Sequence, residues 1–449
     1  MNLTVITGGS SALSLLVTVI TARQLGPSGR GLITLFITVG ATASLFLSCG
    51  INTAARYYLP KRDKVVTLSH YHGLGLILTA VATVVGSGVA FVFARRGGFA
   101  TPAVMLLTTA LCALTMVIWL ESDALNAVGL LVRNAIINGA GTVIQVVILV
   151  GLSLFSRLTL TGALAALDVG MAAQALVCIA ALARAGHRVQ PAFDRRASRL
   201  LLKKGVPAMG ANAGLSVTFR FDRFVIAAVL GSVPLGVYSI AVSGSEALRL
   251  FPAAWGQVAF YRLASGEATL RSLRRRRRWI LMAMAVLLLV WAIVTPFVVH
   301  EFVGHRYDGA IRPWRLLLIG EIGIMMYQID ARLLGAMGRT VASGIAGVVG
   351  LVIVVPLDLL LIPRHGLTGA AEASVVAYLA TGLTAYLALA LGRDGHARAR
   401  GIPGGGKKAG TAASTTLHGE RAVLEMVTDD PLTHNPLLEE SLPVESEPP

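Results

Sequence analysis

The sequence predicts an all-α integral membrane protein in which about twelve transmembrane helices form two six-helix bundles. Hydrophobic residues make up 55% of the 449 residues and charged residues only 14%, whereas a soluble domain has about 25% charged residues. Apolar segments long enough to cross a bilayer recur along most of the chain, and basic residues gather in alternate loops between them. These three observations exclude a soluble globular protein.

Twelve apolar segments account for most of the chain. The first six cover residues 2–21, 32–54, 65–94, 101–120, 134–155 and 158–183, and the second six cover residues 206–230, 235–260, 279–300, 313–334, 341–361 and 369–391. We expect an N-terminal lobe at 1–183 and a C-terminal lobe at 205–391, joined by a basic cytoplasmic connector at 184–204. Residues 392–449 lack a pattern that would bury a core, so we expect a disordered cytoplasmic tail there.

The basic residues indicate the orientation of the helices. They concentrate in the second, sixth and eighth loops, as Arg56, Lys61, Arg62 and Lys64, then Arg184, Arg188, Arg195, Arg196, Arg199, Lys203 and Lys204, then Arg262, Arg271 and the arginines at 274–278. The positive-inside rule places these loops and both termini in the cytoplasm. This clustering explains the net charge of +16 without nucleic acid as a partner. We interpret the five arginines at 274–278 as a topology signal or a contact with membrane lipids.

An internal repeat relates the two predicted lobes. Five positions recur at an offset of 205 residues, and the pairs are Leu25 with Leu230, Gly26 with Gly231, Gly31 with Gly236, Gly9 with Gly214 and Phe46 with Phe251. Because each copy has six spans, both copies would enter the membrane in the same direction. We therefore expect parallel repeats about a pseudo-two-fold axis along the membrane normal, with a substrate site between the lobes.

The hairpin at residues 206–260 carries charges inside apolar helices. They are Arg220, Asp222 and Arg223 in its first helix and Glu246 and Arg249 in its second. Arg220 and Glu246 each lie about ten residues from the turn at 231–234, or ~15 Å at the helical rise, which is about half of a hydrocarbon core. We expect these two residues to face each other at mid-membrane depth. Charges so placed in a bilayer are typical of functional sites.

Two short motifs resemble a known family of transporters. They are Arg23-Gln24-Leu25-Gly26-Pro27-Ser28-Gly29-Arg30-Gly31, and Phe221-Asp222-Arg223 through Leu230-Gly231 to Leu235-Gly236-Val237-Tyr238. With the twelve-span layout, residues 1–391 resemble the polysaccharide flippase branch of the multidrug/oligosaccharidyl-lipid/polysaccharide exporter superfamily. The resemblance implies a central cavity lined chiefly by the first two helices of each lobe, and export of undecaprenyl-diphosphate-linked saccharides across the bacterial cytoplasmic membrane. Drug exporters share this fold, so it leaves the substrate open.

Arginine suits such a substrate because its forked donors match phosphate oxygens. The candidate ligands are Arg220 and Arg223 first, Arg249 next, and then Arg23, Arg30 and Arg56 near the ends of the first two helices. In the alternative, Asp222 and Glu246 neutralise Arg220 and Arg249, and the pairs only fasten two helices together. Arg23 and Arg30 would then only flank a turn.

Four further acids lie inside the predicted spans. A carboxylate that loses a proton on one side of the membrane could couple transport to a gradient. Asp168 and Glu321 are the coupling candidates, with a hydrogen-bonded packing role as the alternative. We interpret Asp330 with Arg332 as a local pair, and Asp358, which follows a proline, as a helix-break feature.

The histidines and cysteines predict no cofactor. His70, His72, His300 and His305 lie at span edges without ligand spacing, so we expect solvated interfacial histidines and no metal site. The three cysteines fall within apolar spans and indicate packing, with neither a disulfide framework nor a zinc site.

No catalytic motif favours an enzyme. The sequence has no P-loop, no nucleophile elbow and no loop with paired carboxylates. We therefore predict a transporter that flips an undecaprenyl-diphosphate-linked saccharide from the inner to the outer leaflet by alternating access, with a polysaccharide polymerase or glycosyltransferases as candidate partners. The alternatives are a multidrug antiporter of the same fold, a membrane glycosyltransferase or polymerase, and a scaffolding membrane protein.

Overall fold

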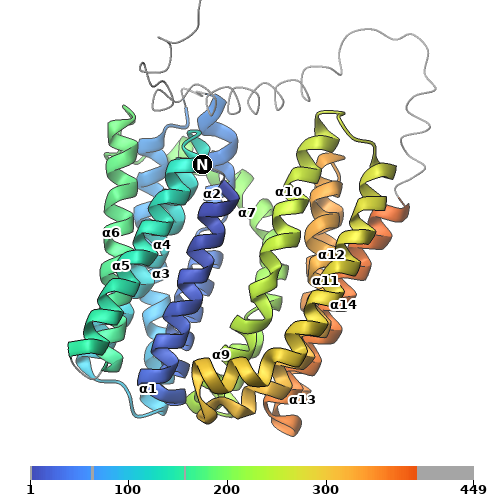
Figure 1. The fold of residues 1–449 in the computed structure, drawn as a ribbon. Helices are drawn as coiled ribbons and strands as arrows, with labels where there is room; N and C mark the ends of the chain where they lie inside the picture. Colours follow the sequence, from blue (N-terminus) through green and yellow to red (C-terminus); the bar gives the residue numbers. More distant parts are fainter. Residues whose placement is uncertain (1–2, 62–64, 156–157, 392–449) are drawn as a thin grey trace, which may run out of the picture. The chain divides into compact units, whose positions relative to one another are not determined.

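The computed structural model describes residues 3–61, 65–155 and 158–391, and every regular element within them is a helix (Figure 1). The expected tail at 392–449 lies outside the described residues, as do Arg62 and Lys64 of the second loop. The predicted all-helical membrane fold is confirmed.

Six α-helices form the first part of the chain. They are α1 (Leu3–Leu47), α2 (Ile51–Tyr58), α3 (Leu68–Arg96), α4 (Pro102–Ala127), α5 (Leu131–Phe155) and α6 (Leu160–Arg184). Helix α1 covers the first predicted span and most of the second, whose last residues lie in α2, and it is kinked at Gly26, whose φ of 66° is rarely adopted by a residue with a side chain. Pro27 follows and has no N–H to donate to the preceding turn. The structure therefore has a bend within one helix where a loop between two helices was predicted.

Eight α-helices form the second part. They are α7 (Arg195–Thr218), α8 (Phe221–Val229), α9 (Ser232–Glu246), α10 (Leu250–Ala264), α11 (Leu270–Val298), α12 (Ile311–Ala336), α13 (Thr340–His365) and α14 (Leu367–Leu391). Three short helices join them: η2 (Ala247–Arg249) follows α9, while η3 (Val299–Val303) and η4 (His305–Ala310) lie between α11 and α12. Helix α12 packs against α14, and α14 packs against α13.

Both helices predicted for the central hairpin are broken near their charged residues. In place of one helix at 206–230, α7 ends at Thr218 and α8 begins at Phe221, and Arg220 between them has φ −134° and ψ −13°. In place of one helix at 235–260, α9 and α10 are separated by the 3-10 turn η2. Discontinuous helices of this kind bring polar groups to the binding sites of transporters.

Eight described helices are long and apolar enough to cross a membrane, namely α1, α3, α4, α5, α6, α13, α14 and the helix formed by α11 with η3. Helix α1 counts once although it covers the first predicted span and most of the second. The remaining predicted spans fall on α7 with α8, on α9 with α10, and on α12, where helix breaks or charged side chains interrupt the apolar run. Every predicted span therefore corresponds to a helix or to a broken helix.

The two copies of the predicted repeat contact each other where α1 lies beside α9 (Figure 1). A Cβ atom added to Gly31 would lie 1.9 Å from the carbonyl oxygen of Ser232, and a Cβ added to Gly236 would lie 1.9 Å from the carbonyl oxygen of Pro27. Both pairs of residues are related by the offset of the repeat, so the contact is reciprocal, as at a two-fold axis. Only glycine permits this approach, which we call the α1–α9 seam.

Candidate functional site

The helix breaks of the central hairpin gather its charged side chains. Arg220 precedes α8, Asp222 and Arg223 lie in the first turn of α8, and Glu246 ends α9. Arg249 ends the short turn η2. Together with Arg30 from α1, these residues form the site described below.

Arg249 is fully engaged within the C-terminal lobe. Its Nε and Nη2 donate to the two carboxylate oxygens of Glu321 at 2.6 and 2.7 Å, and its Nη1 lies 3.2 Å from Glu246. Its guanidinium group also lies over the ring of Phe219, 4.6 Å from the centroid. Glu321 is completely buried. A bidentate pair of this kind fastens η2 to α12 and leaves Arg249 few donors for another ligand.

Glu246 pairs with different residues from the one predicted. Its carboxylate lies 3.7 Å from Arg223 and 3.2 Å from Arg249. In the described part of the chain, Arg220 forms no ion pair with Glu246, although the two charges lie close enough to act on each other. Arg220 and Glu246 therefore lie near each other without a direct ion pair, and their facing at mid-membrane depth stays a prediction.

Arg220 and Arg223 have buried donors without acceptors. Arg220 Nη1 and Arg223 Nε are shielded from solvent and have no hydrogen-bond partner among the described residues. Arg223 lies near enough to both Arg220 and Arg30 for the positive charges to repel one another. A buried donor without a partner costs about 1–3 kcal/mol, and more when the group is charged. These donors therefore favour an anionic partner.

Arg30 reaches across the α1–α9 seam and meets no carboxylate among the described residues. Its side chain donates to the hydroxyl groups of Thr21 at 3.1 Å, Thr18 at 3.2 Å and Ser239 at 3.3 Å. The residue is only 7% exposed. We define Arg30, Arg220 and Arg223 as the arginine cluster, to which Glu246 supplies a carboxylate partner.

The other two candidate ligands have structural partners. Arg23 donates to the carbonyl oxygens of Phe302, at 2.7 Å, and of Glu301, so it joins α1 to η3. Arg56 pairs with Asp123, which also accepts a hydrogen bond from Asn52 at 2.7 Å. The structure does not bring either arginine into the arginine cluster by any contact among the described residues.

The buried acids differ from their predicted surroundings. Asp222 accepts hydrogen bonds at 2.7 Å from the Tyr238 hydroxyl and from its own helix at the Arg223 N–H. Asp358 lies close enough to act on the charge of Asp222, and neither of its oxygens has a hydrogen-bond partner among the described residues. Helix α13 continues past Asp358, so its interpretation as a helix-break feature is wrong. Two neighbouring buried carboxylates repel each other when both are ionised.

Asp330 pairs with an arginine distant in the sequence. Its carboxylate lies 3.0 Å from Arg277, whose guanidinium group is 5.0 Å from the ring centre of Tyr386. The predicted local pair with Arg332 is therefore wrong, and one arginine of the run at 274–278 is an internal residue and not a surface signal. Asp168 is buried and has no hydrogen-bond partner among the described residues. Its coupling role stays a prediction.

A comparison with family models adds an independent result. A model described as "Polysaccharide biosynthesis protein" matches residues 1–265, which is more than half of the chain and includes the arginine cluster. The chain belongs to the polysaccharide biosynthesis protein family. A comparison with curated protein sequences finds no match.

Solved structures show the fold of this family member. A lipid II flippase, MurJ, in an inward closed conformation has a TM-score of 0.70 at 14% identity, covering 95% of this chain and 98% of that chain. An inward-facing multidrug resistance transporter of the MATE family and the MOP superfamily has a TM-score of 0.64 at 18% identity, covering 85% and 94%. The two-lobe fold of this exporter superfamily is confirmed. The chain is therefore a multi-pass membrane protein with the fold that this flippase and this transporter share.

The family member has a basic pocket in addition to the arginine cluster. This pocket has a volume of about 620 Å³ and is lined by Arg195, Ser198, Arg199, Leu202 and Lys203 of α7. These residues belong to the predicted connector, where basic side chains indicate membrane orientation. The arginine cluster differs because its donors are buried and lie beside the seam between the two repeats. Its arrangement is suited to holding a multivalent anion.

Proposed function

We propose that the protein flips an undecaprenyl-diphosphate-linked saccharide from the inner to the outer leaflet of the bacterial cytoplasmic membrane. The observation that carries the proposal is the arginine cluster, in which three positive side chains from both repeats lie near two carboxylates, Glu246 and Asp222. The diphosphate would accept hydrogen bonds from the donors of Arg220 and Arg223 that have no partner. The saccharide would occupy the central cavity that the family resemblance implies, while the polyprenyl chain stays in lipid.

Alternating access would open and close the α1–α9 seam. The seam lies beside Gly26 and Gly231, next to the first and seventh loops, which the distribution of basic residues places outside. In the conformation described here, the seam would close the outer side, so that the substrate binds from the inner leaflet. Asp168, and the Asp222–Asp358 pair, would supply the groups that couple this movement to a proton or cation gradient. Glu321 is a weaker candidate because Arg249 holds it.

A cationic drug is the main rival substrate, because a multidrug transporter shares the fold. The charge of the site discriminates between the two classes. Arg249 and Glu321 neutralise each other, while Glu246 and Asp222 offset two of the three positive charges of Arg30, Arg220 and Arg223. An excess of buried positive charge attracts a diphosphate and repels a cation.

Direct binding tests the proposed phosphate site. Purified protein would be titrated with an undecaprenyl-diphosphate-linked saccharide, and the Arg220→Ala/Arg223→Ala variant should bind at least tenfold more weakly, since charge-assisted hydrogen bonds contribute about 1.5–3 kcal/mol each. Arg276→Ala is a matched control because Arg276 is exposed, and it should bind as the unmodified chain does. Equal affinity of all three proteins would contradict the site. Preferential binding of a cationic drug would favour the rival.

A further inference from the structure

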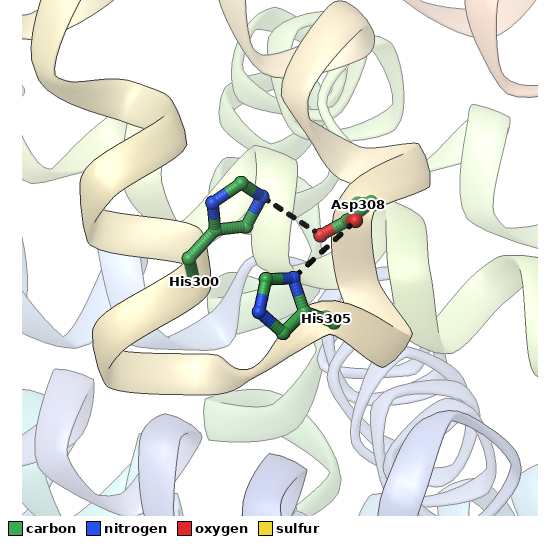
Figure 2. Close-up of side chains that lie close together, drawn as sticks. All are labelled: His300, His305 and Asp308. Carbon is green, nitrogen blue, oxygen red and sulfur yellow. Dashed lines mark ion pairs between the residues drawn. The ribbon is translucent and has the colours of Figure 1, made fainter.

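The loop between α11 and α12 gathers two histidines and an aspartate, as Figure 2 shows. His300 Nε2 lies 3.0 Å from Asp308 Oδ1, and His305 Nδ1 lies 3.6 Å from Asp308 Oδ2. The two imidazole rings are 4.5 Å apart between centroids. One ligand atom from each residue lies within 4.8 Å of the other two. The three side chains therefore converge on one point.

The local chain geometry explains this convergence. Pro296 near the end of α11 has no N–H for the carbonyl oxygen of Ala292, which instead accepts a hydrogen bond from Arg315 at 2.9 Å. The helix then widens into the π-helical turn η3, closed by a 2.8 Å hydrogen bond from the N–H of Gly304 to the carbonyl oxygen of Val299. Single π-helical turns are frequent at functional sites.

Gly304 reverses the chain after this turn. Its φ of 107° is one that residues with a side chain rarely adopt. The reversal brings His305 back over His300, and the following 3-10 helix η4 brings Asp308 to both (Figure 2). The spacing is five residues between the histidines and three more to the aspartate, which matches no standard helical ligand pattern. The spacing therefore gives no sequence signal for this cluster.

The donor set fits a divalent transition-metal ion. Tetrahedral Zn²⁺ binds imidazole nitrogen and carboxylate oxygen at about 2.0–2.2 Å, which puts neighbouring ligand atoms about 3.3–3.5 Å apart. The nitrogen-to-oxygen distances, 3.0 Å from His300 to Oδ1 and 3.6 Å from His305 to Oδ2, lie on either side of this value, and a small rotation of the Asp308 carboxylate would turn one oxygen toward both rings. Two protonated histidines with ring centroids 4.5 Å apart would repel each other, whereas two neutral imidazoles and one carboxylate can share a single cation.

We propose that His300, His305 and Asp308 form a binding site for a divalent transition-metal ion, with Zn²⁺ as the best match. Imidazole ligands select Zn²⁺, Cu²⁺ or Ni²⁺ over Mg²⁺ and Ca²⁺. Solvent reaches the site, since the side chains of His300, His305 and Asp308 are 35%, 79% and 50% exposed. Water would complete the coordination, and the ion would enter without any opening of the fold.

The site adjoins the contact between this loop and α1. The carbonyl oxygens of Glu301 and Phe302, directly after His300, accept hydrogen bonds from Arg23. The hydroxyl of Tyr307, directly before Asp308, donates to the carbonyl oxygen of Ala22 at 3.0 Å. A bound ion would stiffen the loop in the conformation that holds α1. If the proposed function holds, a stiffer loop stabilises the closed α1–α9 seam, so the bound ion slows transport. This inference rests on the proposed function.

Metal binding is measured independently of transport. Full-length protein without a polyhistidine tag would be reconstituted in nanodiscs, freed of metal with a chelator and titrated with Zn²⁺ against a chromophoric competitor. We expect the His300→Asn/His305→Asn variant to bind one Zn²⁺ fewer per chain than the unmodified protein. Mg²⁺ in excess should not displace the ion. Equal Zn²⁺ stoichiometry and affinity in the two proteins would overturn the proposal, as would a failure of the unmodified chain to bind Zn²⁺.

His365→Gln is the matched control. His365 lies 2.9 Å from Glu372 and is exposed like the proposed ligands, but no third ligand accompanies this pair among the described residues. This variant should keep the full Zn²⁺ stoichiometry. If it lost the same ion as the double variant, the assignment to the loop would be wrong. Asp308→Asn should keep the fold and weaken Zn²⁺ binding at least tenfold.

The effect on the junction has its own readout. In the unmodified protein, Zn²⁺ should slow amide hydrogen exchange at residues 299–310 and at residues 20–26 of α1. In Arg23→Ala, Zn²⁺ should still slow exchange in the loop, with a smaller effect on α1. Zn²⁺ that binds but leaves exchange in α1 and the flipping rate unchanged would refute the regulatory role. Flipping by the metal-free double variant at the unmodified rate would show that the proposed function survives independently of the metal site.

Discussion

The α1–α9 seam makes a quantitative prediction for Gly236→Ala. The new Cβ would lie 1.9 Å from the carbonyl oxygen of Pro27, whereas a carbon and a carbonyl oxygen touch at about 3.3 Å. The helices must therefore separate locally by about 1.4 Å, because the obstacle is main chain and cannot rotate away. Overpacking of this kind costs about 1–3 kcal/mol, which corresponds to a shift of about 5–150-fold in a conformational equilibrium.

A disulfide reports this equilibrium. The hydroxyl oxygens of Ser28 and Ser232 lie 3.4 Å apart across the seam, so cysteines at these two positions should cross-link when the seam is closed. Adding Gly236→Ala should lower the initial cross-linking rate at least fivefold, and Gly31→Ala should do the same because the contact is reciprocal. The native cysteines would be replaced in all proteins compared.

Gly9→Ala is the control for the seam variants. Gly9 lies in α1, and a Cβ added there would have no atom within 4 Å. Its cross-linking rate should equal that of the parent. If Gly236→Ala also left the rate unchanged, the close approach of α1 and α9 would not exist in the membrane, and the reasoning from the repeat would be refuted.

Three further predictions concern buried pairs and one helix cap. Glu321→Gln should lower the melting temperature of the purified protein far more than Glu267→Gln, a substitution of an exposed residue, because breaking a buried ion pair costs about 3–5 kcal/mol. Equal melting temperatures of the two variants would contradict the role of the Arg249–Glu321 pair. Arg277→Ala should destabilise more than Arg276→Ala, since only Arg277 pairs with buried Asp330, and equal effects in a thermal scan would refute the internal role. The N–H of Ala197 donates to Asp194 and holds the pKa of this carboxyl below its usual range. The cap is therefore complete above the usual pKa and is lost as the pH falls through the lowered pKa. Amide hydrogen exchange in the first turn of α7 should speed up only in acid. Exchange that stays constant with pH, after correction for the intrinsic pH dependence of amide exchange, would contradict this.

The sequence predicted the spans and the repeat well because both depend on local patterns. Apolar length alone indicates a membrane helix, and the glycine pairs Gly26 with Gly231 and Gly31 with Gly236 remain visible because both copies need the same positive φ and the same close approach. At Gly26 and Pro27 the sequence predicts a loop between two helices, whereas the structure has one kinked helix, α1. Glycine and proline indicate a break in helical geometry, but they do not show whether the chain resumes a helix directly after it.

The partners of the buried charges could not be predicted. Arg249 pairs with Glu321 and Arg277 with Asp330, over separations that only tertiary packing determines. The break at Arg220 has no proline or glycine to mark it, so the sequence pattern predicts a continuous helix there. The convergence of His300 and His305 required a π-helical turn, which no hydrophobic period indicates.

Flipping in liposomes tests the central claim most directly. The purified protein would be reconstituted with a fluorescent undecaprenyl-diphosphate-linked saccharide, and the fraction of label exposed to an external quencher would be followed over time. We expect the unmodified chain and Arg276→Ala to flip the lipid, and Arg220→Ala/Arg223→Ala at equal protein content to flip it at least tenfold more slowly. Equal rates for the double variant and the unmodified chain, or movement of cationic drugs without movement of the lipid-linked saccharide, would contradict the account.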